Sequence, residues 1–170
     1  LQPLPKFTQA TTNTATSYAL DEHGDVWAWG GYAFYFGIGS PAQVHTVSAP
    51  LKLTRNGNAH FAALDAALTA GVKPTSIQVS LNSVHVLLDD GSLWGWGDAA
   101  MGEVGDGHIV NYLSVVPDGA GANTVRDAWD WGTTRSLVLD AVKVMTHVRY
   151  FATTAYSFHV MAVRKNGQIY

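Results

Sequence analysis

The 170-residue sequence contains no cysteine, which excludes disulfide bonds, thiolate metal sites and cysteine nucleophiles together. It also has no cluster of Lys or Arg to follow a phosphate backbone, and its formal net charge of −3 disfavours a nucleic-acid partner. The apolar runs are shorter than the roughly 20 residues that a helix needs to cross a bilayer, so no membrane span is expected. Charged residues make up 14% of the chain and hydrophobic residues 47%, which predicts a well-packed domain. The compartment stays open, because a secreted bacterial protein and a cytosolic one both fit this composition.

The sequence also lacks a recognisable catalytic or metal-binding motif. Its seven histidines are scattered, and no two have the i, i+4 spacing of a zinc helix. His85 stands six positions before a turn glycine, as Tyr18 does, which indicates a strand residue. The Asp-Gly turns do not continue into the oxygen ligands of a calcium loop, and no nucleophile elbow or phosphate-binding loop occurs. We therefore predict no catalytic residue, no metal and no cofactor, and a protein that is not an enzyme.

What the sequence does contain is a repeated tryptophan phrase. All six tryptophans fall into three copies of Trp-x-Trp-Gly, which begin at Trp27, Trp94 and Trp129. A chain that confines so large a side chain to one phrase reuses one structural position. We expect core packing for these tryptophans, and a stacking platform for sugars or bases is the alternative.

The first two copies align without a gap, residues 20–30 with residues 87–97. In each, an apolar alternating run enters a polar turn that ends in Gly24 or Gly91, and the returning run carries the tryptophans. Glycine adopts the positive φ angles of tight hairpin turns at little steric cost. Each copy therefore predicts a β-hairpin, and both tryptophans of a copy should point to the same face of the sheet.

Two further segments match the phrase in part. Residues 163–170 follow the same register, with Gly167 at the turn and Tyr170 in the place of the first tryptophan. The copy at Trp129 and Trp131 has Arg126 where the turn glycine would stand. That degenerate copy is compatible with a decayed hairpin, a helix start or an ordered loop.

Spaced glycines follow the second phrase, at five, eight and ten positions beyond Gly97. Together with the acidic turn, the Asp-Gly pair and the Trp-Gly pair before them, they resemble the repeat of the regulator-of-chromosome-condensation family. The resemblance implies an all-β fold made of β-propeller blades, in which these residues are structural. The repeat residues are Gly24, Trp27, Trp29, Gly30, Gly91, Trp94, Trp96, Gly97, Gly102, Gly105, Gly107 and Gly167.

The chain is short for a closed propeller, which generally needs about four to eight blades. We expect about two and a half blades of an incomplete ring, with repeat-like units at about residues 14–57, 75–117 and 142–170, the third of them truncated. Two explanations fit: the chain is a piece of a longer protein, or several copies complete a ring. The first is favoured.

Two insertions are expected between these units, at about residues 58–74 and 118–141. Residues 59–70 are rich in helix formers, with Phe61, Leu64 and Leu68 at helical spacing and Asn58 placed to cap the start. One short helix is therefore predicted in the first insertion. The second carries the degenerate tryptophan copy.

Function is expected in the segments that interrupt the repeat, because loops on a rigid scaffold commonly carry binding sites. The most aromatic of them contains the candidate partner-binding residues Tyr32, Phe34, Tyr35 and Phe36. These side chains would bind a partner or fill a gap between blades. The sequence thus favours a scaffold for protein–protein interaction or self-assembly. A carbohydrate-binding or accessory propeller of a secreted enzyme is the alternative, and guanine-nucleotide exchange on a small GTPase rests on the family resemblance alone.

Overall fold

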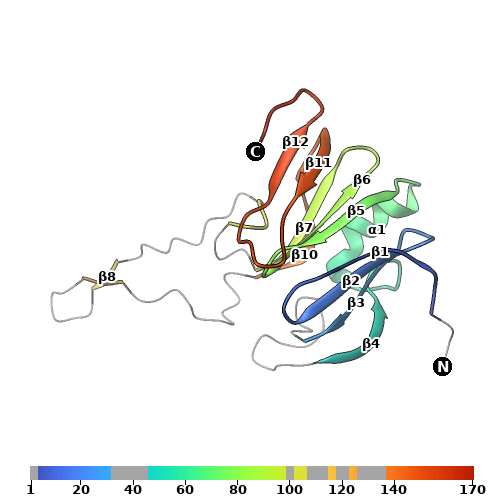
Figure 1. Cartoon of the computed structure of the whole chain (residues 1–170), viewed down its shortest axis with the longest axis horizontal. Coiled ribbons are helices and arrows are strands. Elements are labelled where there is room, and N and C mark those ends of the chain that lie inside the picture. The colour runs from blue at the N-terminus through green and yellow to red at the C-terminus, as the bar shows by residue number, and fades with distance from the viewer. Residues whose placement is uncertain (1–3, 32–45, 99–101, 107–114, 118–122, 126–136) are drawn as a thin grey trace.

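Two four-stranded antiparallel sheets stand side by side, and a third pair of strands follows them (Figure 1). The computed structural model describes residues 4–31, 46–98, 102–106, 115–117, 123–125 and 137–170. The first sheet has the order β1–β2–β3–β4, formed by Phe7–Thr12, Thr16–Asp21, Val26–Gly30 and Val47–Lys52. The second has the order β10–β7–β6–β5, formed by Leu137–Met145, Leu93–Asp98, Ser83–Leu88 and Pro74–Val79.

The third unit consists of β11 (Val148–Ala152) and β12 (Met161–Arg164), which pair antiparallel. A bridge between Val163 and Ile169 continues it beyond the next turn. Two short strands, β8 (Val115–Pro117) and β9 (Asn123–Val125), pair with each other and with none of the other described strands. In the part of the chain that the structure describes, no helix is long and apolar enough to span a bilayer.

The hairpins predicted from the repeat are confirmed. Strands β2 and β3 are joined by a turn with Gly24 at φ +77°, and β6 and β7 by a turn with Gly91 at φ +85°. The third copy turns at Gly167 before the bridge to Ile169. Within each hairpin the residues alternate between faces, so the fold follows the period-2 pattern of the sequence.

Two outer strands carry no part of the repeated phrase. Strand β1 lies before the unit expected at residues 14–57, and β10 begins inside the insertion expected at residues 118–141. Both are outer strands of their sheets, and neither carries a Trp-Gly pair. The repeat in the sequence therefore marks the two central strands of each sheet and leaves the outer ones unmarked.

The helix predicted at residues 59–70 is also confirmed. A 3-10 turn, η2 (Ala59–Phe61), leads into α1 (Ala62–Thr69), and the Asn58 side chain accepts a hydrogen bond from the His60 N–H at 3.1 Å. Three apolar side chains of this segment are buried: Phe61, Leu64 and Leu68. They close one side of the core between the first two sheets.

That core defines the first junction, where the sheet β1–β4 meets the sheet β5–β6–β7–β10. Its members include Tyr18, Leu20, Val26, Val84, Val86, Trp94 and Trp96. The second junction lies between the opposite face of the second sheet and the pair β11–β12. Its buried members are Leu87, Leu93, Val148, Phe151 and Ala162.

A glutamine side chain bridges each junction. Gln9 of β1 donates to the Thr75 carbonyl at 2.8 Å and accepts from the Ile77 N–H at 3.3 Å. Gln78 of β5 makes the corresponding pair of bonds to β11 and the residue after it, donating to the Phe151 carbonyl and accepting from the Thr153 N–H. An amide can donate and accept at once, so each glutamine satisfies two backbone groups of the next sheet.

Candidate binding site at the sheet junctions

The two aligned tryptophan phrases have different surroundings. Trp94 and Trp96 lie at the first junction and are 5% and 0% exposed. Trp27 and Trp29, at the same repeat positions in the first sheet, are only half-buried and pack against Phe7 of β1, with ring centroids 5.9 and 6.1 Å apart. The difference arises because a sheet lies against the second pair and none of the described sheets lies against the first.

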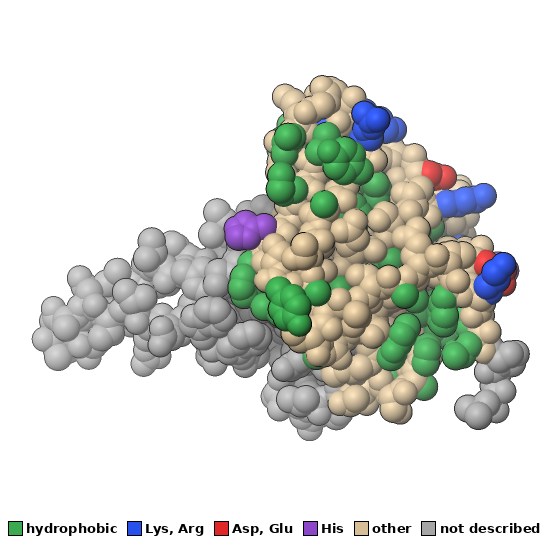
Figure 2. All heavy atoms as spheres, in the orientation of Figure 1, with side chains coloured by type: hydrophobic (Ala, Val, Ile, Leu, Met, Phe, Trp, Pro, Cys, Tyr) green, Lys and Arg blue, Asp and Glu red, His purple; other side chains and the backbone are tan. Residues whose placement is uncertain are grey.

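In the part of the chain that the structure describes, two sheet faces therefore have no further sheet packed against them, and they are called the open faces below. The tryptophan face consists of Phe7, Trp27 and Trp29. The Met161 face, on the outer side of β11–β12, consists of Tyr150, Met161 and Ile169, which are 54%, 56% and 65% exposed. Register places these three together, because Val163 pairs with both Tyr150 and Ile169 and lies two residues from Met161. Apolar side chains gather over β12 and over the edge of the sheet β1–β4 in Figure 2.

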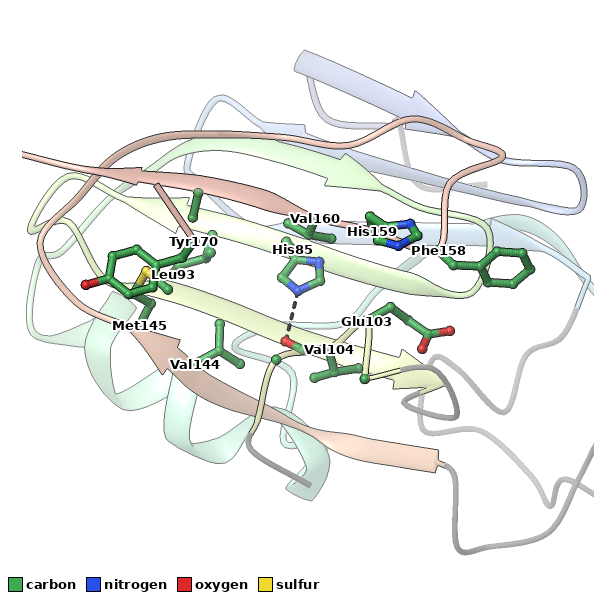
Figure 3. Close-up of a pocket in the computed structure, with 13 residues that line it drawn as sticks. His85, Leu93, Glu103, Val104, Val144, Met145, Phe158, His159, Val160 and Tyr170 are labelled. Carbon is green, nitrogen blue, oxygen red and sulfur yellow. Dashed lines mark hydrogen bonds between the residues drawn. The ribbon is translucent and has the colours of Figure 1, made fainter. Parts of the chain in front are cut away.

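A pocket of about 270 Å³ opens at the second junction (Figure 3). His85 of β6 and Leu93 of β7 line it from the second sheet. Ala162 lines it from β12, and Phe158, His159 and Val160 line it from the segment that leads into β12. Its remaining lining residues are Gly102, Glu103, Val104, Gly105, Val144, Met145 and Tyr170. Most of these side chains are apolar, so the polar groups among them decide what the pocket can recognise.

His85 and Glu103 are the buried polar residues among those that line this pocket. The His85 side chain is 1% exposed, and its Nε2 lies 3.1 Å from the Val104 carbonyl oxygen, the bond dashed in Figure 3. A carbonyl only accepts, so Nε2 carries the proton and Nδ1 of the neutral ring is an acceptor. No described residue gives Nδ1 a hydrogen-bond partner. Burial lowers the pKa of His85 to about 4, against the smaller opposing effect of the Val104 bond, and the ring is neutral at pH 7.

Protein stability should therefore fall as the pH is lowered from about 6.5 to 4. The unfolded chain binds a proton at His85 near the ordinary histidine pKa, whereas the folded chain resists it until about pH 4. Between these values we expect His85 to remove about 3 kcal/mol of unfolding free energy. Urea unfolding of the native chain and of His85→Gln at several pH values measures this. The difference in unfolding free energy between the native chain and His85→Gln should change by that amount between these two pH values. Curves of unfolding free energy against pH that run parallel for the two proteins would contradict the prediction.

A second polar cluster anchors the turn of the first hairpin. The buried Asp25 carboxylate lies 2.6 Å from Nζ of Lys52 and 2.6 Å from Nε of Arg55, and it accepts a bond from Thr54. Burial acts to raise the pKa of Asp25, and the bonds from Arg55 and Lys52 outweigh it, so the pKa lies below its usual value. The Asp25 carboxylate thus connects the turn of the first hairpin to Lys52 at the end of β4 and to the residues that follow it.

The aromatic loop that carries Tyr32, Phe34, Tyr35 and Phe36 lies outside the described residues, so its role in binding stays a prediction. Gly107 and the degenerate copy at Trp129 and Trp131 lie outside them as well. Within the described residues, no group of three or more His, Asp or Glu side chains is placed to hold a metal ion. The sequence marked His85 as a strand residue, which is confirmed, but it gave no signal for the pocket around it.

Comparison with solved structures identifies the arrangement of the sheets. Prp20p from Saccharomyces cerevisiae matches 96% of the chain with a TM-score of 0.60 and 18% sequence identity. Human WBSCR16 matches 99% with a TM-score of 0.55 and 18% identity. The chain has the fold of a regulator-of-chromosome-condensation-type propeller. Its sheets are propeller blades, and the blade fold expected from the tryptophans and spaced glycines is confirmed.

The match covers only part of each solved propeller. The chain spans about a third of the length of these structures, 31% of Prp20p and 33% of WBSCR16. No protein-family model matches the sequence, and no curated protein matches it. The likeness therefore concerns the blades and how they stack.

Proposed function

We propose that the chain is a non-enzymatic propeller scaffold that binds protein through its two open blade faces. One observation carries the proposal: the tryptophan pair that is fully buried between blades in the second blade is only partly buried in the first. Partly exposed aromatic clusters of this kind are typical of interaction sites rather than of free surface.

The two open faces are the two halves of one junction. Met161 stands six positions before its turn glycine, as Tyr18 does, and Ile169 stands two after it, as Val26 does. At the first junction, Tyr18 and Val26 belong to the cluster that contains Trp94 and Trp96. The Met161 face therefore presents the residue positions that cover a tryptophan pair, and the tryptophan face presents such a pair.

The partner that fits this geometry is a second copy of the chain, stacked head to tail. In that arrangement the Met161 face of one copy packs on the tryptophan face of the next, which is a heterologous contact between different surfaces. Apolar blade faces in contact would bury the exposed side chains as the first junction does.

Sedimentation velocity over a range of concentrations tests the proposal with two blocked variants. Trp29→Lys blocks the tryptophan face and Met161→Lys blocks the Met161 face. We expect the native chain to associate, each variant alone to remain monomeric, and an equal mixture of the two to form a dimer through the faces left intact. Tyr156→Lys, at an exposed tyrosine of the loop between β11 and β12, is the matched control and should associate like the native chain.

Two results would count against blade-face association. A native chain that stays monomeric at high concentration would remove it outright. Dimers of either variant alone would show that a face pairs with itself, which is a different symmetry. Circular dichroism of each variant distinguishes lost association from lost folding.

Guanine-nucleotide exchange on a small GTPase is a second candidate, supported by the likeness to Prp20p. That structure is described together with the binding of Prp20p to Gsp1p and histones. Faster nucleotide release from a GTPase in the presence of this chain would favour the exchange function. If the chain does not accelerate release, the scaffold function is favoured. Binding on a glycan array would favour the carbohydrate-binding alternative in the same way.

A further inference from the structure

The chain contains two Asn-Gly pairs, at residues 56–57 and 166–167, and both are exposed. The first lies between β4 and the helix α1 (Figure 1), and the second forms the turn after β12. In such a pair the backbone nitrogen of the glycine can attack the side-chain amide of the asparagine before it. Glycine permits this attack more readily than other residues, because it has no Cβ atom to hinder it. Both pairs are therefore candidates for spontaneous deamidation.

The two pairs share three features. A basic residue precedes each asparagine, and each asparagine is exposed. Each Oδ1 also accepts a hydrogen bond from the N–H two residues later, from Asn58 at 2.9 Å in the first pair and from Gln168 at 3.1 Å in the second. Negative charge develops on this oxygen when the amide carbon is attacked, so the N–H stabilises the intermediate in both pairs. Local sequence, exposure and charge stabilisation thus do not distinguish them.

The attacking nitrogen does distinguish the two pairs. The N–H of Gly167 donates a hydrogen bond to the Arg164 carbonyl oxygen at 2.9 Å, inside the hairpin turn. Among the described residues, none accepts a hydrogen bond from the N–H of Gly57. The nitrogen has to lose its proton in order to attack, and a proton that is held in a hydrogen bond is harder to remove. The glycine nitrogen of the first pair is therefore the more reactive one.

We propose that Asn56 is a site of spontaneous deamidation in the folded chain. A base in the solvent takes the proton from the Gly57 nitrogen, which forms a bond to Cγ of Asn56. The bond from Cγ to Nδ2 breaks, that nitrogen leaves as ammonia, and a succinimide ring remains. Water then opens the ring at either carbonyl and gives aspartate or isoaspartate. One water is consumed and one ammonia is released, and nothing is oxidised or reduced.

Deamidation changes how this loop is held to β4. Nδ2 of Asn56 donates a hydrogen bond to the Lys52 carbonyl oxygen, and a carboxylate, which only accepts, cannot replace it. Isoaspartate also lengthens the backbone by one methylene group before Asn58, the residue that caps η2. We therefore expect the start of the helical segment to open more often after deamidation. The site lies on neither open blade face, so the inference does not depend on the association proposed above.

The test compares the two Asn-Gly pairs within one molecule. The native chain is incubated at mildly alkaline pH below its unfolding temperature, and peptide mapping by mass spectrometry follows the deamidated fraction at each asparagine. We expect deamidation at Asn56 to be about tenfold faster than at Asn166, because the Gly167 N–H must first give up its hydrogen bond. In urea, where that bond is lost, the two rates should become equal. Equal rates in the folded chain, or a difference that persists in urea, would overturn the proposal.

Hydrogen exchange followed by mass spectrometry tests the effect on the loop. Asn56→Asp carries the charge of one product, and Asn166→Asp, which adds the same charge at the other pair, is the matched control. We expect faster exchange at residues 59–61 in Asn56→Asp and in the incubated native chain, and no change there in Asn166→Asp. Asn56→Gln, whose longer side chain disfavours ring closure, should show no increase on incubation. Native exchange rates in both Asn56→Asp and the incubated chain would contradict the loosening of the loop.

Discussion

Replacing Trp96 with alanine should lower the free energy of unfolding by roughly 3–5 kcal/mol, the usual cost of truncating a large buried aromatic residue. The side chain is fully buried, and its ring lies edge-on to Phe61 at 5.2 Å and to Tyr18 at 6.2 Å. It therefore contacts the insertion helix region and the first blade together with its own blade. Alanine would leave a cavity at the meeting point of three elements, and chemical denaturation measures the loss.

Trp29 provides a matched control, because it occupies the same repeat position in the first blade. It is half-buried, so Trp29→Ala should cost on the order of 1 kcal/mol, well below the cost at Trp96. Equal losses at the two positions would contradict the difference in burial. A small loss at Trp96 accompanied by loss of ligand binding would instead favour the stacking-platform alternative for that residue.

The contrast between these two tryptophans shows what sequence alone predicts and what it does not. The phrase Trp-x-Trp-Gly and its turn glycine predict the hairpin and the shared face, because both depend on local backbone geometry. Whether that face is buried depends on which sheet lies against it, and that sheet comes from a distant part of the chain. The shared phrase therefore predicts the blade hairpin correctly and leaves the exposure of its tryptophans undetermined.

The helix and the outer strands show the same difference between features that local sequence determines and features that depend on distant parts of the chain. Asn58 and the apolar spacing of Phe61, Leu64 and Leu68 are local signals, and they predict the helix. Strand β10 joins its sheet only after a long excursion from β7, so no local pattern identifies its partner. The bridging glutamines Gln9 and Gln78 likewise have no motif, since their bonds go to the backbone of the next blade.

The placement of the His85 ring depends on one residue difference within the phrase itself. The second copy has Gly95 between its tryptophans, where the first has Ala28. A Cβ atom at Gly95 would lie 2.8 Å from Nε2 of His85 and 3.2 Å from the Val104 carbonyl oxygen. Glycine at this position thus allows the imidazole to lie across the strand and donate to Val104. The sequence shows the glycine, but only the folded chain shows what it accommodates.

Gly97→Ala should also destabilise the fold strongly, by roughly 3–5 kcal/mol, through the sum of backbone strain and steric overlap. Gly97 has φ +121°, a conformation that side-chain-bearing residues rarely adopt. An added Cβ would lie 2.4 Å from the Asn82 carbonyl oxygen and 2.8 Å from Cα of Ser83. Both are backbone atoms of the adjacent strand entry, so neither can move without shifting β6.

Gly102→Ala separates the two contributions. Gly102 has φ +76°, and no described atom lies within 4 Å of the position that its Cβ would take, so alanine there should cost only the roughly 1–2 kcal/mol of a left-handed backbone. Thermal and urea unfolding of the two variants measure the difference. If Gly97→Ala is as stable as Gly102→Ala, then β6 and β7 relax around the new methyl group, and the steric part of the prediction is wrong. The expected gap instead means that Gly97 is needed for the close packing of the end of β7 against the start of β6. The first blade has the same arrangement, because a Cβ atom added at Gly30 would lie 2.4 Å from the Ala15 carbonyl oxygen.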